Sequence, residues 1–336
     1  MSDTYRALQV TAPGVLDLVH RPLIAPVAGQ VRIRVEACGV CHSDSLAVEG
    51  ILAVDYPRVP GHEVVGTIDA IGEGVQGWTV GQRVGVGYQG GTCGYCDSCR
   101  RGQFMTCENQ LSTGLDYDGG YAEVMIAQAN GLAAIPDGLS AAEAAPILCA
   151  GVTVFNGLRN SVARAGDLVA IQGVGGLGHL GIQYARKMGF RVAAIARGRE
   201  KEALAQGFGA HHYIDSEGGD PVAAVRDLGG AKVILATAAD SKSAGLLVEA
   251  LAPQGQLVVA GASFEPMEVD AVKMLFGEQS IIGTLTGSPI EREDTLGFTA
   301  LQDIRAMTEA VPLAQAAEAY RRMMRNEARF RMVLTP

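Results

Sequence analysis

Basic residues are in short supply in this chain. Its 336 residues carry 27 lysines and arginines against 36 aspartates and glutamates, a net charge of −9. Nucleic acids and anionic membranes attract surfaces with an excess of positive charge, which this composition does not provide. The chain also lacks any run of about 18 apolar residues, the length that a membrane-spanning helix needs. We therefore expect neither nucleic acid nor a membrane among its partners.

We expect no secretory leader. The opening residues MSDTYRALQV do not follow a charged stretch with an apolar one, so we expect a cytoplasmic protein. Reducing conditions there would keep its seven cysteines available as thiolates. No internal repeat is visible, and 48% hydrophobic residues supply ample buried material. A chain of this length is too long for one ordinary core, so two domains are expected.

Four of the cysteines lie in one short stretch with the spacing C-x2-C-x2-C-x7-C. They are Cys93, Cys96, Cys99 and Cys107. Four thiolates so close in sequence can complete a tetrahedral zinc shell, with Zn–S bonds of about 2.3 Å and no open position. Disulfides are the alternative, but cysteines two residues apart cannot easily pair locally. The spacing favours a structural zinc site.

The N-terminal part of the chain reads as short strands and turns. Residues 30–37 alternate apolar and polar side chains, the pattern of a half-buried antiparallel strand. Residues 64–68 and 82–86 are further short strands interrupted by glycines. We predict a small β-barrel domain over residues 1–148.

The pattern changes near residue 149. Continuous apolar runs indicate buried strands at 168–172, 192–196, 233–236, 257–260 and 281–283. Helical patterns separate several of them, notably around 200–208 and 242–251. Apolar strands alternating with helices are typical of a doubly wound parallel sheet, an α/β fold, here assigned to residues 149–287. Residues 288–336 are polar and helical before a last strand at 330–334, which we expect to return to the N-terminal domain.

A glycine-rich loop follows the first of these buried strands. Gly173-Val174-Gly175-Gly176-Leu177-Gly178 matches G-x-G-x-x-G between a predicted strand and a predicted helix. The glycines permit a tight turn and close approach of the backbone to a pyrophosphate, and the helix N-terminus attracts the anion. A plain structural turn is the alternative reading. The strand–turn–helix context favours dinucleotide binding.

The end of the next strand bears on which dinucleotide is bound. An acidic residue is expected there in NAD-binding proteins, to accept from the ribose 2′-hydroxyl. The chain instead has Ala196, followed by Arg197, Arg199 and Lys201. These cations can pair with a 2′-phosphate, so NADP(H) is favoured over NAD(H). The alternative is that they form an ordinary solvated helix start.

Three further motifs carry a family resemblance. They are Cys41-His42-Ser43-Asp44, the stretch Gly61-His62-Glu63-x2-Gly66-x5-Gly72-x2-Val75, and Cys149 to Thr153. With the cysteine quartet and the glycine loop they resemble, over nearly the whole chain, the zinc-containing alcohol dehydrogenases of the medium-chain dehydrogenase/reductase superfamily. The resemblance implies a GroES-like barrel plus a Rossmann domain. It also implies two zinc ions per chain, a homodimer or homotetramer, and reversible oxidation of primary or secondary alcohols.

The resemblance also implies residue roles. Cys41, His62 and Cys149 would hold the catalytic zinc, leaving one position for substrate oxygen. Ser43 would take the alcohol proton, Asp44 would orient His62, and Glu63 would be an occasional ligand. Cofactor contacts are implied for His42, Thr153 and Arg331.

One position departs from the family pattern. Many relatives carry a histidine five residues after the first zinc cysteine, where this chain has Leu46. The proton route beyond Ser43 must therefore differ here. Cys38 is expected to be a core residue, and the histidines outside the motifs are expected to be structural or exposed; these are His20, His179, His211 and His212.

Three rival readings remain open. A zinc-free quinone reductase should lack both cysteine sets. A polyol dehydrogenase often has a glutamate where this chain has Cys149. A zinc ribbon that binds nucleic acid or a partner protein would need only the quartet. The loop around it has only a small basic cluster, and the domain is acidic, which disfavours this reading.

Overall fold

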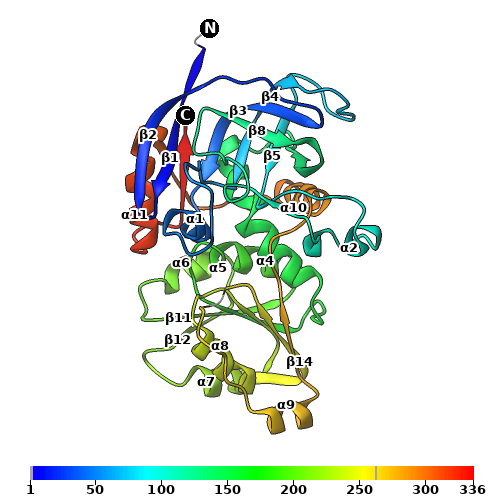
Figure 1. The fold of residues 1–336 in the computed structure, drawn as a ribbon. Coiled ribbons are helices and arrows are strands. Elements are labelled where there is room, and N and C mark those ends of the chain that lie inside the picture. Colours follow the sequence, from blue (N-terminus) through cyan, green and yellow to red (C-terminus); the bar gives the residue numbers. More distant parts are fainter. Residues whose placement is uncertain (1–2, 262) are drawn as a thin grey trace. The chain divides into compact units, whose positions relative to one another are not determined.

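The protein divides into two compact units. The computed structural model describes residues 3–261 and 263–336. Unit 1 comprises the residues up to Val152 and those from Thr286 onward, and unit 2 comprises Thr153–Leu285. Figure 1 shows both units as a ribbon coloured along the sequence.

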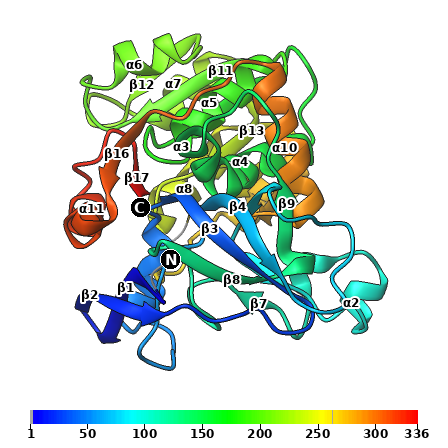
Figure 2. The same ribbon diagram turned by 90° about the horizontal axis from the view of Figure 1, so that it is seen from above.

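Unit 1 is built on a mainly antiparallel sheet. Its strands lie in the order β16-β17-β3-β4-β5-β9, with β8 also paired to β3. Their bounds are β3 (Gln30–Gly39), β4 (Val64–Ile71), β5 (Arg83–Val86), β8 (Val124–Gln128), β9 (Leu132–Ala134), β16 (Thr308–Pro312) and β17 (Arg331–Thr335). Figure 2 shows β8 running beside β3. The predicted strands at 30–37, 64–68 and 82–86 are confirmed.

The alternation along β3 explains why this strand forms the centre of the sheet. Val31, Ile33 and Val35 are buried, whereas Arg34 and Glu36 are exposed. Successive side chains of a strand point to opposite faces, so the apolar set fills the core of unit 1. The C-terminal strand β17 pairs antiparallel with the end of β3, at Val333 with Gly39. Strands from the N-terminal and the C-terminal parts of the sequence therefore share one sheet.

The remaining elements of unit 1 surround this sheet. They are β1 (Thr4–Ala12), β2 (Val15–Pro22), β6 (Gln89–Gly91), β7 (Leu111–Ser112), α1 (Ser45–Val48), α2 (Asp97–Arg100), α3 (Ala141–Ala144), α10 (Pro289–Leu301) and α11 (Ala316–Met324). Helix α10 begins with a capping box in which Ser288 and Glu291 satisfy each other's backbone N–H groups.

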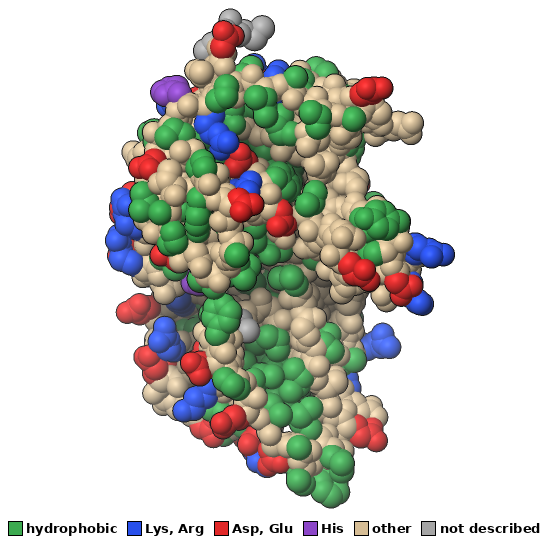
Figure 3. All heavy atoms as spheres, in the orientation of Figure 1, with side chains coloured by type: hydrophobic (Ala, Val, Ile, Leu, Met, Phe, Trp, Pro, Cys, Tyr) green, Lys and Arg blue, Asp and Glu red, His purple; other side chains and the backbone are tan. Residues whose placement is uncertain are grey.

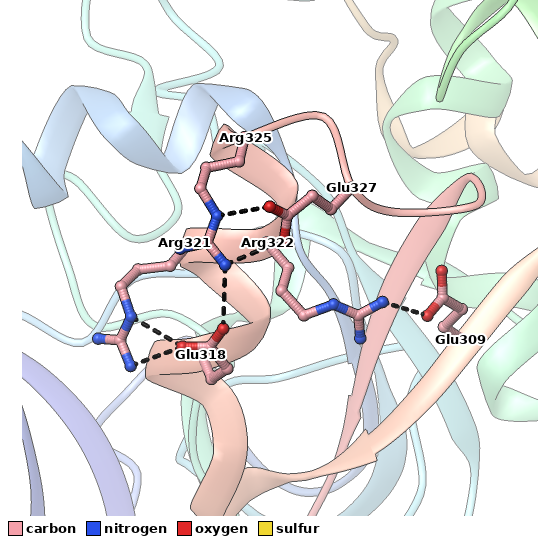
Figure 4. Close-up of polar contacts among 6 residues, drawn as sticks. All are labelled: Glu309, Glu318, Arg321, Arg322, Arg325 and Glu327. Carbon is pink, nitrogen blue, oxygen red and sulfur yellow. Dashed lines mark hydrogen bonds and ion pairs between the residues drawn. The ribbon is translucent and has the colours of Figure 1, made fainter.

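Helix α11 carries a network of surface ion pairs. Glu318 pairs with Arg321 at 2.9 Å and with Arg325 at 3.2 Å, and Arg325 also binds Glu327 at 2.8 Å (Figure 4). Arg322 reaches Glu309 on β16 at 2.7 Å. Exposed pairs of this kind contribute little to stability, because water and salt screen them. The network therefore holds α11 against β16 only modestly.

Unit 2 is a parallel sheet whose strands alternate with helices. The order β12-β11-β10-β13-β14-β15 corresponds to 3-2-1-4-5-6, the arrangement of the Rossmann fold. The strands are β10 (Leu168–Gln172), β11 (Arg191–Ala196), β12 (His212–Asp215), β13 (Ala231–Ala236), β14 (Leu251–Val259) and β15 (Ser280–Gly283). The helices are α5 (Gly178–Lys187), α6 (Glu202–Gly207), α7 (Pro221–Asp227), α8 (Ser241–Leu247) and α9 (Ala271–Gly277). The predicted fold class is confirmed.

No single helix in the described residues has the length and apolar composition to span a membrane. Ala141–Leu148 and Ala150–Arg159, the latter being α4, pass that test only as a pair bent by 54°. Many of their side chains are buried in the protein, including Ile147, Leu148 and Val154.

Candidate metal centres and cofactor loop

Two groups of side chains in unit 1 bring metal-ligating atoms together. One group is the quartet of Cys93, Cys96, Cys99 and Cys107. The other consists of Cys41, His62, Glu63 and Cys149. Within each group the ligating atoms lie within 4.8 Å of one another. The residues that sequence reasoning linked in each set are therefore neighbours in the structure.

The second group is assembled from three separate segments. Cys41 follows β3, and His62 and Glu63 directly precede β4. The antiparallel pairing of β3 with β4, with Cys38 opposite Val64, brings these two segments side by side. Cys149 comes from the junction before α4, and its Sγ lies 4.0 Å from Sγ of Cys41. Two thiolates on one tetrahedral zinc ion would be about 3.8 Å apart, so the pair fits that ion.

His62 is oriented by a buried carboxylate. Its Nδ1 lies 2.8 Å from Oδ1 of Asp44, and both side chains are almost completely buried. Its Nε2 has no hydrogen-bond partner in the described parts of the chain. Burial alone would lower the pKa of His62, but the Asp44 carboxylate and the Cys41 thiolate outweigh it and raise the pKa well above its usual value. The unpartnered Nε2 is the atom that a metal ion would satisfy.

The two thiols of this site lie within hydrogen-bonding distance, with the sulfurs 4.0 Å apart. A hydrogen bond from Cys149 lowers the pKa of Cys41 well below its ordinary value, and the same contact raises the pKa of Cys149. Metal ligation requires thiolates, and the lowered pKa of Cys41 favours that form.

Glu63 is completely buried and forms an ion pair with Arg331 at the start of β17. Burial raises the pKa of Glu63 to about 7, although the Arg331 guanidinium opposes this shift. The second carboxylate oxygen, Oε2, has no partner in the described residues. Arg331, which the resemblance assigned to the cofactor, is thus engaged with Glu63.

The other predicted residues near Cys41 differ in exposure. His42 is exposed, and Ser43 and Leu46 are half-buried, in the short helical turns after Cys41. Cys38 is fully buried, as predicted for a core residue. Thr153 is buried in α4 and belongs to unit 2.

The cysteine quartet is held by its own loop. Sγ of Cys107 lies 3.6 Å from that of Cys93 and 4.0 Å from that of Cys96. Backbone N–H groups point at the sulfurs. For example, the N–H of Cys96 donates to Sγ of Cys93 at 3.4 Å. Desolvation opposes ionisation of Cys93, but backbone N–H groups of Tyr95 and Cys96 lower its pKa to about 6. The quartet fits a closed tetrahedral zinc site.

The glycine loop in unit 2 has the features expected of a dinucleotide-binding turn. Gly173 follows β10 with a φ of +92°, and a Cβ on Gly178 would overlap its carbonyl oxygen. A Cβ on Gly175 would meet nothing within 4 Å, so the backbone there is open to approach. His179 is fully buried, and its Nδ1 lies 2.9 Å from the Gly175 carbonyl oxygen. Its role in this structure is to hold the loop.

The loop after β11 contains the cations predicted to bind the 2′-phosphate of NADP(H). Arg197 is exposed and makes no salt bridge within the described residues. Arg199 is paired with Glu202 at 3.0 Å. Asp215, at the end of β12 beside Ala196, accepts the Gly198 N–H at 2.8 Å. That carboxylate had not been singled out from the sequence.

Sequence reasoning also missed residues around the two metal groups. Tyr121 donates to Asp44, and the Tyr88 ring stands edge-on to His62 with centroids 5.5 Å apart. Arg292 on α10 is completely buried and donates to the carbonyl oxygens of Gln89 and Gly131. None of the three belongs to a motif, so only the folded chain reveals them.

Comparison with known proteins gives concordant results. Residues 27–137 match the family model "Alcohol dehydrogenase GroES-like domain", and residues 176–301 match "Zinc-binding dehydrogenase". The chain is 41% identical to the alcohol dehydrogenase patD of Penicillium expansum over 95% of this chain and 94% of that protein. It is 37% identical to an alcohol dehydrogenase of Geobacillus stearothermophilus, over 94% of each chain. A cobalt- and zinc-bound thermostable alcohol dehydrogenase from Pyrobaculum aerophilum superposes with a TM-score of 0.89 at 26% identity, covering 99% of this chain and 100% of that one.

Proposed function

The chain belongs to the zinc-containing alcohol dehydrogenase family of the medium-chain dehydrogenase/reductase superfamily, and from this premise we propose that Cys41, His62 and Cys149 hold its catalytic zinc. The protein is an oxidoreductase, a zinc-dependent alcohol dehydrogenase that transfers hydride reversibly between NAD(P) and an alcohol. The proposal for the ligands is carried by one observation: the two sulfurs and the imidazole converge with Nε2 of His62 unpartnered.

The residues of this site have distinct tasks. When bound, zinc supplies a Lewis acid that polarises the substrate oxygen. Asp44 accepts the Nδ1 hydrogen of His62 at 2.8 Å and so directs Nε2 toward the thiols. Ser43 takes the proton of the alcohol. Glu63, neutralised in part by Arg331, is close enough to the same group to serve as an occasional ligand.

The quartet is proposed to hold a second, structural zinc ion, which makes two per chain. Support comes from the sulfur separations of 3.6 and 4.0 Å and from the backbone N–H groups that stabilise the thiolates. All four positions of a tetrahedral ion would then be filled by protein, so this ion would have no part in the reaction.

NADP(H) is the proposed cofactor. Its pyrophosphate would lie on Gly173 to Gly178, and its 2′-phosphate near the loop after β11. Arg197 is the best placed cation there, because Arg199 is already paired with Glu202. We expect Arg197→Ala to lower kcat/KM with NADPH about tenfold and to leave that with NADH nearly unchanged, in initial-rate assays. The matched variant Arg199→Ala should have a smaller effect, and equal loss with both cofactors would contradict the assignment.

A second copy of this chain is the proposed partner, alongside a small alcohol or carbonyl substrate, in the cytoplasm. Helix α9 exposes Val272, Leu275 and Phe276, the last at 83%. Figure 3 shows hydrophobic side chains gathered at the lower end of the view, where Figure 1 draws α9. Helix α9 packs against β14, and among the described residues the edge strand β15 pairs with β14 alone. An unpaired edge strand next to an apolar surface favours association, as a dimer or tetramer. Light scattering that found a monomer at micromolar concentration would contradict this.

Cys41→Ser tests the catalytic assignment. The variant should lose one zinc ion per chain and lower turnover by at least about 10³-fold, equivalent to roughly 4 kcal/mol of transition-state stabilisation. Cys38→Ser, at a buried cysteine outside both ligand groups, is the matched control and should keep both metals. Zinc content by atomic emission and alcohol oxidation rates provide the measurements. Full activity in Cys41→Ser would refute the assignment.

A further inference from the structure

Tyr121 contacts the carboxylate that orients His62. It lies in the segment before β8, and its side chain is completely buried. Its hydroxyl donates to Oδ2 of Asp44 at 2.7 Å. Burial and then the Asp44 charge raise the pKa of Tyr121 well above its usual value, so the hydroxyl stays protonated and remains a donor.

The Asp44 carboxylate is therefore held on both oxygens. Oδ2 accepts from Tyr121 and from the backbone N–H of Cys41, the latter at 2.9 Å. Oδ1 receives Nδ1 of His62 at 2.8 Å. Three donors from three segments fix the plane of one carboxylate. Two of them belong to the residues proposed as zinc ligands, and Tyr121 is the third.

The ring of Tyr121 also packs against the peptide that precedes His62. Gly61 has a φ of +98°, and a Cβ there would overlap the Tyr121 ring. The backbone N–H of Tyr121 donates to the carbonyl of Pro60 at 3.0 Å, and that of Gly120 donates to the carbonyl of Gly61, also at 3.0 Å. The segment before β8 thus fixes the backbone that precedes His62. The Tyr121 hydroxyl fixes Asp44, the hydrogen-bond partner of the His62 imidazole.

We infer that Tyr121 is a positioning residue of the catalytic metal site, whose hydroxyl fixes Asp44 and thereby the orientation of the His62 imidazole. This rests on the proposed role of Cys41, His62 and Cys149 as zinc ligands. Partners of a metal-bound histidine raise its basicity and fix its tautomer, so loosening them weakens the hold on the metal. If Tyr121 merely filled the core, its ring would stabilise the fold and its hydroxyl would have no effect on the metal site.

Tyr121→Phe separates these two roles, because it keeps the ring and removes the hydroxyl. We expect the catalytic zinc to dissociate into excess chelator about tenfold faster, with the structural zinc unaffected. Tyr117→Phe is the matched control. It removes a buried hydroxyl that lies 2.8 Å from Oγ1 of Thr113, away from Asp44. Its zinc release should equal that of the unmodified protein. The visible spectrum of cobalt bound at the catalytic site should change in Tyr121→Phe and not in Tyr117→Phe.

Coupling to Asp44 provides an independent check. In an Asp44→Ala background, Tyr121→Phe should accelerate zinc release by much less than it does alone, because the acceptor of the Tyr121 hydroxyl is already absent. Zinc release from Tyr121→Phe at the unmodified rate, with an unchanged cobalt spectrum, would overturn the inference while leaving the ligand assignment intact. If Cys41→Ser kept both zinc ions, the ligand assignment itself would fail, and this inference with it.

Discussion

The two metal groups of unit 1 are built in opposite ways. The quartet comes from a single loop, Cys93 to Cys107, whereas Cys41 and Cys149 are 108 residues apart. A local loop can gather its ligands through turns and backbone N–H groups alone. The other group requires the β3–β4 pairing and the junction before α4 to be in place. Local spacing is therefore enough to recognise the first group, and the fold is needed to complete the second.

Their surroundings differ as well. The sulfurs of the quartet accept hydrogen bonds from neighbouring backbone groups of the same loop. The distributed group is instead surrounded by buried ionisable side chains, with Asp44 on His62 and Arg331 on Glu63. Buried charges are costly unless paired and are characteristic of functional sites. The contrast separates a stabilising centre from a reactive one.

Removing a ligand from each group should produce opposite phenotypes, and this is the largest effect we predict. Cys93→Ser should lower the free energy of unfolding by several kcal/mol, because binding energy of a structural zinc ion is folding energy. Cys41→Ser should cost much less stability while abolishing turnover. Urea denaturation followed by fluorescence measures the first quantity. If both variants lost stability equally, the two centres would not differ as described.

Arg292 provides a sharper test of what supports the quartet. It donates to the carbonyl of Gln89, whose side-chain amide in turn donates to the carbonyl of Phe104 within the cysteine-bearing loop. Arg292→Met should reduce the free energy of unfolding by about 3 kcal/mol, since it leaves buried carbonyl groups without donors. Arg321→Met, which removes an exposed ion pair on α11, is the control and should cost under about 1 kcal/mol. Equal losses in urea titrations would contradict the role of Arg292.

Leu46→His should produce the smallest effect, confined to the distributed site. The side chain is half-buried in α1, just after Ser43. A histidine here would add a group with a pKa of about 6.5 to the proton route. The pH profile of kcat/KM for alcohol oxidation should gain a limb near that pH, measured from pH 5 to 9. Leu46→Asn, which cannot titrate, should keep the original profile. An unchanged profile in Leu46→His would show that the position lies outside the proton route.

Much of the fold could be predicted from patterns within short windows. The apolar runs of β10, β11 and β13 and the alternation of β3 are strong periodic signals. Strand β12 was missed because His212–Asp215 is short and mostly polar, and β16 was missed because Thr308–Pro312 has no apolar run. Both lie at the edge of a sheet, where one neighbour suffices.

The candidate site was harder to predict from the sequence than the fold was. Spacing and resemblance pointed to Cys41, His62 and Cys149, whose side chains do come together. They could not indicate that Arg331 pairs with Glu63 or that Tyr121 reaches Asp44, because these contacts join residues 268 and 77 positions apart. Such pairings depend on the strand order of the folded sheet, which no local pattern encodes.

Anomalous scattering from crystals of the zinc-loaded protein, measured on both sides of the zinc absorption edge, tests the central claim most directly. We predict two peaks per chain. One should lie within bonding distance of Cys41, His62 and Cys149, and the other within the quartet, at Zn–S distances of about 2.3 Å. A single peak at the quartet, with Cys41 and Cys149 bonded to no metal, would contradict the account.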